Sequence, residues 1–119
     1  MSAPKPESTT VSKNDVQLIG RLSQAPEERV LPSGDTVWTF RVVVPRRRHA
    51  AKSRQAVDAI ECAAWSARAR RSASSWAAGD VVEVRGELHR RFFRAGGAVA
   101  SRVEVEMTSG RLIRRAASG

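Results

Sequence analysis

The sequence has few of the residues that build redox sites, metal centres or membrane spans. Its 119 residues include one cysteine, Cys62, so an intramolecular disulfide and a cysteine-based metal site are both excluded. No apolar run approaches the roughly 18 residues of a transmembrane helix. The N-terminal segment also lacks the apolar stretch of a signal peptide. We therefore expect a soluble protein of a reducing compartment, the cytoplasm, with no membrane association.

Residues that carry catalytic chemistry are also scarce. The two histidines, His49 and His89, lie in separate basic segments, and neither has a serine or cysteine partner in a recognisable motif. The acidic residues show no paired spacing of the kind that general acid–base or metal chemistry requires. We expect a protein that is not an enzyme and that uses no metal and no other cofactor.

Lysine is rare, although the chain is strongly basic. Lys and Arg together number 21, of which three are lysine and 18 arginine, against 12 acidic residues, and the formal net charge is +9. Arginine forks onto phosphate and stacks on bases, whereas lysine is a point charge. A bias to arginine over lysine is equally typical of a GC-rich genome. The net charge itself favours nucleic acid over an acidic protein as the partner.

Residues 36–57 concentrate this charge beside a strand. The first half is rich in β-branched and aromatic residues and ends at Pro45, which predicts a strand. The loop that follows, residues 45–56, is cationic, and no acidic residue occurs from Thr36 to Val57. A buried strand that presents a cationic loop is suited to hold a polyanion. The cations are Arg46, Arg47, Arg48, Lys52 and Arg54.

Alternation of apolar and polar residues predicts one domain of five long strands. Residues 1–13 contain almost no apolar side chain and are expected to form a disordered tail. The domain then covers residues 14–109, and 110–119 form a short basic extension, frayed beyond Ile113. Strands are expected at 14–22, 36–45, 57–65, 81–94 and 99–107, with a short extra strand at 28–31.

Several local features refine this pattern. Gly20 predicts a bulge or sharp bend in the first strand, and residues 32–35 predict a turn in which Gly34 takes a positive φ. Cys62 falls on the inward parity of its strand and is interpreted as a small core residue. Residues 66–78 have helical periodicity, with an apolar face of Ala69, Ala73 and Trp76, and Gly79 as the C′ residue that ends the helix. The three arginines Arg68, Arg70 and Arg71 form the opposite, solvated face.

The last two strands form a long hairpin with a basic, aromatic tip. The tip comprises Arg90, Arg91, Phe92, Phe93 and Arg94. In the returning strand, alternation places Val99, Val103, Val105 and Met107 inward and Arg102, Glu104 and Glu106 outward. The overall order is β-β-β-α-β-β, with one short helix between the third and fourth long strands. This is the order of an all-β OB-fold, a five-stranded, partly open barrel.

A basic groove combined with aromatic faces is the usual means of holding a single nucleic-acid strand without reading its sequence. The cationic loop and the hairpin tip supply the charge, and the tip also supplies Phe92 and Phe93. Trp65 follows the third long strand and is a stacking candidate, with core packing as an equal alternative. Phe93 shares a face with Arg91 and is the better candidate of the two phenylalanines, because Phe92 has the core parity. Phe40, Trp76 and, less strongly, Trp38 are assigned to the core.

Two segments of the chain resemble the bacterial single-stranded DNA-binding proteins. Residues 14–44 (NDVQLIGRLSQAPEERVLPSGDTVWTFRVVV) are similar to that family's opening Asn-x-Val-x-Leu-x-Gly-x-Leu strand, Pro-Glu loop, Pro-x-Gly turn and Phe-containing strand. Residues 77–93 (AAGDVVEVRGELHRRFF) resemble the family's Gly-x-x-Val-x-Val-x-Gly-x-Leu strand, which leads into a binding hairpin. The resemblance covers about residues 14–108. It implies an OB barrel, usually a homotetramer, that wraps single-stranded DNA over outward loops and aromatic residues.

The resemblance also assigns positions. Trp65 falls where the family has a stacking phenylalanine, and Phe93 where it has a stacking tryptophan. Two further stacking positions, near Arg48 and near Ala59, hold no aromatic residue here. The sequence also shows no Gly/Pro/Gln-rich linker and no acidic tip, the segments through which such proteins recruit partners. We therefore expect binding weighted toward electrostatics rather than tight stacking-driven wrapping, and the resemblance does not carry over a role as a recruitment hub.

The function expected from these observations is sequence-independent binding of single-stranded DNA, in support of replication, recombination or repair. One alternative is a tail-less OB module of the primosome type that bridges a single strand and a replication protein. Another is RNA binding, because backbone and stacking contacts discriminate poorly between sugars unless the 2′-OH is read. The exposed edge of the first strand, with Asp15, Gln17 and Ile19, is suited to pairing across a two-fold axis. A homotetramer is expected first and a dimer second.

Overall fold

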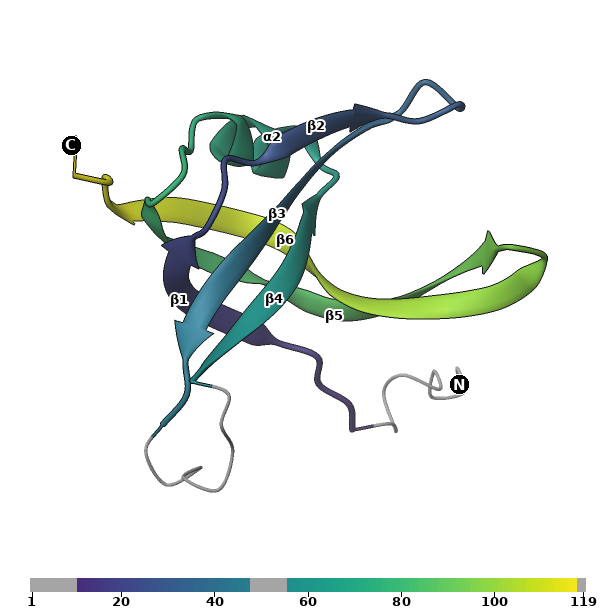
Figure 1. Ribbon diagram of the computed structural model, residues 1–119, viewed down its shortest axis with the longest axis horizontal. Helices are drawn as coiled ribbons and strands as arrows, with labels where there is room; N and C mark the ends of the chain where they lie inside the picture. Colours follow the sequence, from purple (N-terminus) through teal and green to yellow (C-terminus); the bar gives the residue numbers. More distant parts are fainter. Residues whose placement is uncertain (1–10, 48–55, 118–119) are drawn as a thin grey trace, which may run out of the picture.

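The computed structural model describes residues 11–47 and 56–117. In these ranges the chain forms strands that agree closely with the expected ones, and one helix (Figure 1). The expected tail, residues 1–13, lies mostly outside the described residues. The elements are β1 (Val16–Leu22), β2 (Glu27–Val30), β3 (Thr36–Pro45), β4 (Val57–Ala64), α2 (Ala67–Ser74), β5 (Val81–Ala95) and β6 (Ala98–Arg114).

Five of the strands close into a barrel. The hydrogen-bonded order is β1-β5-β6-β4-β3, and β1 then pairs with β3 through Arg21↔Val43 and Leu22↔Val42. All neighbours are antiparallel except β4 and β6, which pair in parallel at Cys62↔Val105. Among the described strands, the short β2 pairs with β3 alone and extends that edge beyond the ring. This is the OB-fold barrel expected from the sequence, with its helix between the third and fourth barrel strands.

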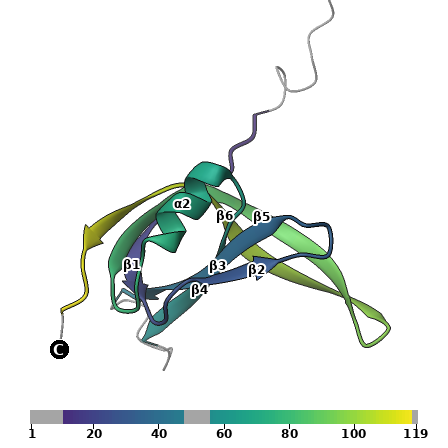
Figure 2. The same cartoon turned by 90° about the horizontal axis from the view of Figure 1, so that it is seen from above.

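The core fills the barrel and is closed on one side by α2 (Figure 2). Ala69 and Ala73 are fully buried, and the Trp76 ring meets the Phe40 ring edge-on, with centroids 5.5 Å apart. These contacts confirm the core assignments of Phe40 and Trp76, while Trp38 is only partly buried against the same cluster. Cys62 is 2% exposed, as expected of a small core residue, and burial raises the pKa of its thiol to about 12.

The helix is shorter than its periodicity predicts. It ends at Ser74 with Ser75 as its C-cap, whose hydroxyl donates to the Ser72 carbonyl, so the prediction that Gly79 terminates it is wrong. The chain leaves the helix early because Trp76 turns into the core. Gly79 instead takes φ +86° in the turn before β5 and donates its N–H to the Leu22 carbonyl at 2.7 Å. The positive φ that favours glycine at this position is therefore required by the turn before β5 and not by the end of the helix.

Two glycines allow strands to approach more closely than any side chain permits. A Cβ on Gly20 would lie 2.4 Å from the Val43 carbonyl oxygen, where β1 passes from its pairing with β5 to its pairing with β3. A Cβ on Gly86 would lie 1.9 Å from the Glu106 carbonyl oxygen, beside a register shift between β5 and β6. The turn expected at residues 32–35 is present, with Gly34 at φ +93°.

Beyond the barrel, β5 and β6 continue as a two-stranded arm. We use "the arm" for residues 87–104, which in the described structure pair only within this hairpin and curve away from the barrel (Figure 1). Val99 and Val103, predicted to face inward, are 66% and 45% exposed, because no core lies beneath them. The predicted end of the last strand at Met107 is also wrong, since β6 runs to Arg114 and pairs there with the start of β5.

No helix among the described residues is long and apolar enough to cross a membrane.

Candidate nucleic-acid interface

A cleft of about 400 Å³ lies between the barrel and the arm. We call it the cleft throughout. Its barrel side is formed by β2, the outward face of β3 and the end of β4, and its other side by the arm. The barrel contributes Arg29, Leu31, Val37, Thr39, Ala63 and Trp65, and the arm contributes Arg91, Phe92, Phe93, Arg102 and Glu104.

Strand alternation explains why these side chains share one space. Val37 and Thr39 are two apart on β3, and Thr39 pairs with Ala63 on β4, so all three project from the same face of the barrel. On the arm, Arg91 and Phe93 are likewise two apart on β5, and Arg91 pairs with Arg102. The two faces meet because the arm curves out beneath the β2–β3 edge (Figure 1).

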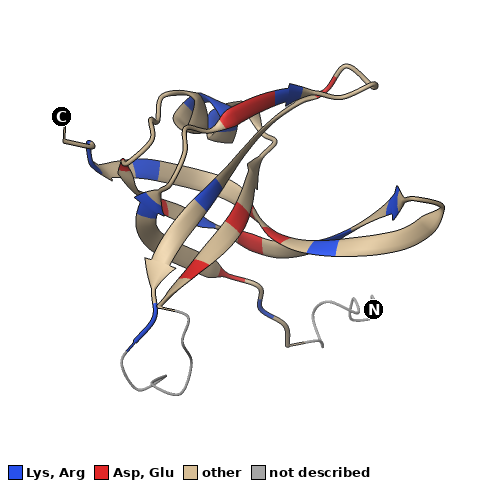
Figure 3. Cartoon of the chain, viewed as in Figure 1, with Lys and Arg blue, Asp and Glu red and all other residues tan. Residues whose placement is uncertain are grey.

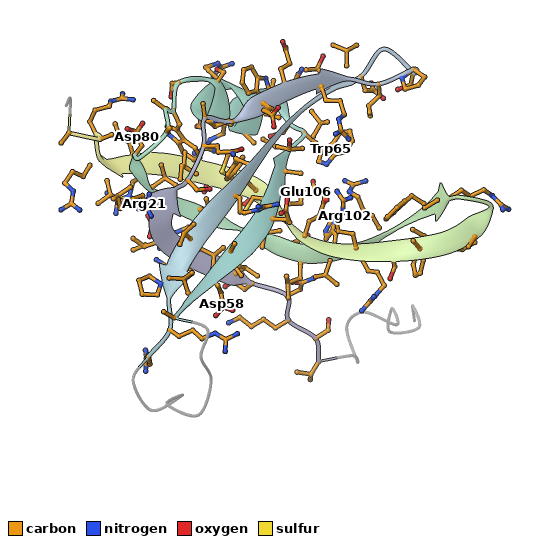
Figure 4. All side chains as sticks on the ribbon, viewed as in Figure 1. Arg21, Asp58, Trp65, Asp80, Arg102 and Glu106 are labelled. Atoms are coloured by element: carbon orange, nitrogen blue, oxygen red, sulfur yellow. The ribbon has the colours of Figure 1, made fainter. Side chains whose placement is uncertain are left out.

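Trp65 occupies the junction of β4 and α2. On its N-terminal side, Ala64 pairs with Trp38 of β3. On its C-terminal side, Ser66 is the N-cap of α2, and its hydroxyl accepts a hydrogen bond from the Ala69 N–H at 3.1 Å. Figure 4 shows Trp65 near the end of β4, on the side that faces the arm and Arg102. The indole N–H is buried and has no hydrogen-bond partner among the described residues. The ring is half-buried, so one part of it contributes to the cleft wall.

Each candidate stacking ring is accompanied by an arginine from the arm. The Arg91 guanidinium carbon lies 4.5 Å from the centroid of the Trp65 ring, and that of Arg102 lies 5.4 Å from the centroid of the Phe93 ring. Both distances are within the range of cation–π attraction. The cleft therefore combines planar aromatic surface with planar cations, the two surfaces on which nucleobases stack.

Phe92 and Phe93 differ in exposure and in the strand face on which they lie. Phe93 is 41% exposed and shares its strand face with Arg91. Phe92 is 69% exposed and has the opposite parity, and it lies where the arm has already left the barrel. Phe93 is thus the better placed of the two to present a ring inside the cleft, and Phe92 contributes to its rim.

The cleft contains one carboxylate, Glu104, among three arginines. Glu104 was expected to face solvent, but its side chain is only 9% exposed, and the Arg91 Nε donates to its Oε2 at 2.6 Å. Glu104 lies on the strand face opposite to the core residues Val105 and Met107, and it is buried because barrel and arm converge around it in the cleft. A buried carboxylate of this kind is stabilised by its cationic partner.

The cationic loop lies at the other end of β3 and β4. In the described part of that loop, Arg47 is exposed, whereas Arg46 forms a fork with Asp58, with its Nη2 2.8 Å from Oδ1 and its Nε 3.1 Å from Oδ2. The hydrogen bond that Arg46 donates to the Asp58 carboxylate raises the pKa of Arg46. Arg48, Lys52 and Arg54 lie outside the described residues.

The structure therefore separates the predicted site residues into two groups. Trp65, Arg91, Phe92 and Phe93 meet in the cleft. Arg46 and Arg47 lie roughly 26 Å away, the length of an eight-residue strand, because β4 runs from the loop to Trp65. Between the two groups, Arg41 on β3 forms an ion pair with Glu61 on β4, and Figure 3 shows both signs of charge on these two strands.

The remaining tip residues point elsewhere. Arg90 donates to the Ser101 hydroxyl at 3.0 Å on the parity opposite to Arg91, and Arg94 is exposed beside the turn. Sequence reasoning missed Arg29, Arg102 and Glu104. Arg29 sits on a strand of four residues, and Arg102 and Glu104 were recognised only as outward positions. Their membership of the cleft depends on the strand register and the curvature of the arm, which no local pattern encodes.

Comparison with known proteins relates the chain to one family of proteins. The family model described as "Single-strand binding protein family" matches residues 13–113. "Single-stranded DNA-binding protein 3" of Listeria innocua serovar 6a is 35% identical over 78 residues, which are 66% of this chain and 49% of the relative. "Single-stranded DNA-binding protein A" of Bacillus subtilis strain 168 is also 35% identical over 78 residues, 66% of this chain and 45% of that protein. The chain thus spans about half the length of the curated relatives it matches.

A solved structure shares the fold. The structure titled "Plasmodium falciparum SSB complex with ssDNA" superimposes with a TM-score of 0.69 and covers 89% of this chain and 97% of its own. The two sequences are 23% identical over the match. This likeness shows that the two chains share a fold.

Proposed function

Because the chain belongs to the single-strand binding protein family, we propose that it binds single-stranded DNA in the cleft without reading the base sequence. The observation that carries the proposal is the meeting of Trp65 and Phe93 with Arg29, Arg91 and Arg102 in one open groove. The arginines attract the phosphates, and the rings hold bases by stacking, which is tolerant of sequence because every base has a π-face. The protein acts by binding, and no catalytic step is part of the proposal.

The described side chains favour a single strand over a duplex. A duplex buries its base faces in its own stack, so Trp65 and Phe93 would find no partner there, and only the electrostatic contribution would remain. A single strand satisfies both the cationic and the aromatic surfaces of the cleft. Support of replication, recombination or repair follows as the cellular role of such a protein, and it is part of the proposal.

The direct test is a titration of fluorescent oligo-dT, of a duplex of equal length and of the matched RNA strand, at one fixed ionic strength. We expect tight binding to oligo-dT, weaker binding to the duplex and quenching of the intrinsic tryptophan fluorescence by the DNA strand. Preferred binding to duplex would contradict the assignment. Equal binding to RNA would favour the alternative of an RNA-binding module, since the cleft residues named above show no group dedicated to reading a 2′-OH.

A homotetramer is the proposed assembly, with a dimer as the second candidate. Strand β1 pairs with β5 along residues 16–21, but with β3 only at Arg21 and Leu22, so its other edge is open along most of its length within the described structure. Open edges are natural sites of pairing between copies. Light scattering gives the mass directly, and a monomer at micromolar concentration would exclude both assemblies.

A further inference from the structure

The cleft as it stands is closed to a base at the Trp65 ring. Arg91 lies over that ring at 4.5 Å from its centroid, so the face that projects into the cleft is already in contact with a guanidinium. The indole N–H on the ring edge is buried as well. A base can reach the Trp65 face only if the Arg91 guanidinium moves from it.

Arg91 is held in this place by Glu104. The Nε–Oε2 distance of 2.6 Å is that of a strong, charge-assisted hydrogen bond. The Glu104 side chain is 9% exposed and that of Arg91 is 40% exposed, so the carboxylate is fixed while the guanidinium borders open solvent. Arg102, by contrast, contacts Phe93 and has no carboxylate partner in the described part of the chain.

A carboxylate in a groove for a polyanion opposes binding unless its charge is neutralised. Among the described residues Arg91 is the cation paired with Glu104, so this neutralisation is lost when Arg91 moves away. A phosphodiester that enters the cleft offers Arg91 anionic oxygens that accept a charge-assisted hydrogen bond, as Glu104 Oε2 does. Phosphate and Glu104 therefore compete for a single guanidinium.

From this geometry we propose that Arg91 and Glu104 form a latch. In the free protein Glu104 holds Arg91 over Trp65, and a phosphodiester of the bound strand replaces Glu104 as the partner of Arg91. The guanidinium moves off the ring, and the exposed Trp65 face takes a base. The proposal rests on the proposed function, because it assigns the order of events in the same cleft, and it makes Glu104 a residue that lowers affinity.

The test replaces Glu104 by glutamine, which keeps the shape of the side chain and removes its charge. We expect Glu104→Gln to bind oligo-dT roughly tenfold more tightly than the wild type, which corresponds to about 1.4 kcal/mol. Glu28→Gln is the matched control: Glu28 is exposed on β2, on the strand face opposite to Arg29, and its loss changes the net charge equally. The control should change affinity by no more than about twofold.

A second measurement needs no DNA. Acrylamide quenching of Trp65, taken as the difference from the Trp65→Phe variant, reports how open the ring is. It should rise in Glu104→Gln and rise further in Arg91→Met, which removes the guanidinium altogether. Thermal unfolding of each variant shows that it is folded before its binding is compared.

The outcomes separate the two proposals. If the wild type binds oligo-dT but Glu104→Gln binds it equally or less tightly, Glu104 orients Arg91 for binding and the latch is wrong, while the proposed function stands. Unchanged acrylamide quenching in Arg91→Met would also overturn the latch. If the wild type does not bind oligo-dT at all, the proposed function fails and the latch fails with it.

Discussion

Trp65 and Phe93 occupy comparable places in the cleft, each beside an arginine of the arm. Trp65 is half-buried and Phe93 is 41% exposed. Neither ring is needed to close the barrel, because the core aromatic pair is Phe40 with Trp76. Their backbone positions are nevertheless defined, that of Trp65 by the N-terminus of α2 directly after it and that of Phe93 by the β5–β6 ladder. A ring on a backbone that is ordered before binding requires less ordering of the chain when a base is bound.

Truncation of either ring should therefore weaken binding more than it affects folding. We expect Trp65→Ala and Phe93→Ala each to weaken oligo-dT binding by about 1–3 kcal/mol, the usual value of one base–aromatic stack. Phe92→Ala is the comparison variant and should cost less, because Phe92 has the opposite strand parity and contributes only to the rim of the cleft. Anisotropy titrations at constant salt measure all three. A larger loss for Phe92 than for Phe93 would show that the strand runs along the other face of the arm.

At the scale of secondary-structure elements, β5 and β6 each have two structurally distinct parts. Their first part closes the barrel against β1 and β4, and their second part forms the free arm. The change occurs beside Gly86, where the register between the strands shifts. Such a shift bends and twists a strand pair, and the close approach of the Glu106 carbonyl to Gly86 leaves no room for a side chain.

Gly86→Ala should consequently destabilise the fold. Its Cβ would lie 1.9 Å from a backbone oxygen, so β6 must shift or the bulge must rearrange. We expect a loss of about 1–3 kcal/mol in the free energy of unfolding, as for an overpacked core, with the arm displaced. Gly96→Asn is the control, since Gly96 has φ +58° in the tip turn, no atom within 4 Å of a built Cβ, and a conformation that Asn tolerates. Urea denaturation of both variants distinguishes destabilisation by a steric clash at Gly86 from the general effect of replacing a glycine in this hairpin.

The far end of β6 is held by two carboxylates. Asp80 is fully buried and accepts hydrogen bonds from the Ala77 N–H, the Ala116 N–H and the Arg115 guanidinium at 2.8–2.9 Å. Burial alone raises the pKa of Asp80, but these donors outweigh it and the net pKa is lowered. The pKa of Glu83 is lowered too, first by its hydrogen bond from Arg111 on β6.

These shifts predict the direction of the acid response. A carboxylate whose pKa is lower in the folded chain stabilises it fully above the ordinary pKa, and this contribution is lost as the pH falls through the folded value. Thermal stability should thus be flat near neutral pH and decrease below about pH 4, the ordinary range of Asp and Glu. Asp80→Asn should lower stability at pH 7 and flatten the decrease. If Asp80→Asn loses stability at low pH to the same extent as the wild type, groups other than Asp80 cause the loss of stability in acid.

The elements were largely predictable from the sequence, whereas the cleft was only partly so. Whether a residue faces the core within its own strand or helix can be read from one segment. This holds for the alternation in residues 36–45 and 57–65 and for the apolar helix face of Ala69, Ala73 and Trp76. Val103 has the same alternation but lies on the free arm, so its parity predicted a core that is not there. Arg102 and Glu104 became part of the site through their pairing with β5 and the curvature of the arm. Such relations arise between segments and carry no local signal.

For the whole molecule, the arginines considered for binding lie in two regions, the cleft and the start of the cationic loop. The cleft carries Arg29, Arg91 and Arg102, and Arg47 lies exposed at the opposite end of β4. An oligonucleotide confined to the cleft contacts only the first group. A longer one also crosses the outward face of β3 and β4 toward the loop, which should add phosphate contacts.

The salt dependence of binding should therefore increase with oligonucleotide length. Each phosphate contact contributes a slope of about −0.7 to log K against log[salt], so three cleft arginines give about −2 for a short oligo-dT. OB-folds occupy about 4–16 nucleotides, and an oligo-dT at the upper end of that range should give a steeper slope. Arg102→Ala should reduce the slope by about 0.7 for both lengths, whereas Arg47→Ala should reduce it for the longer one alone. Equal slopes for the two lengths, together with no effect of Arg47→Ala, would mean that the bound strand leaves the protein at the cleft and never follows β4 to the cationic loop.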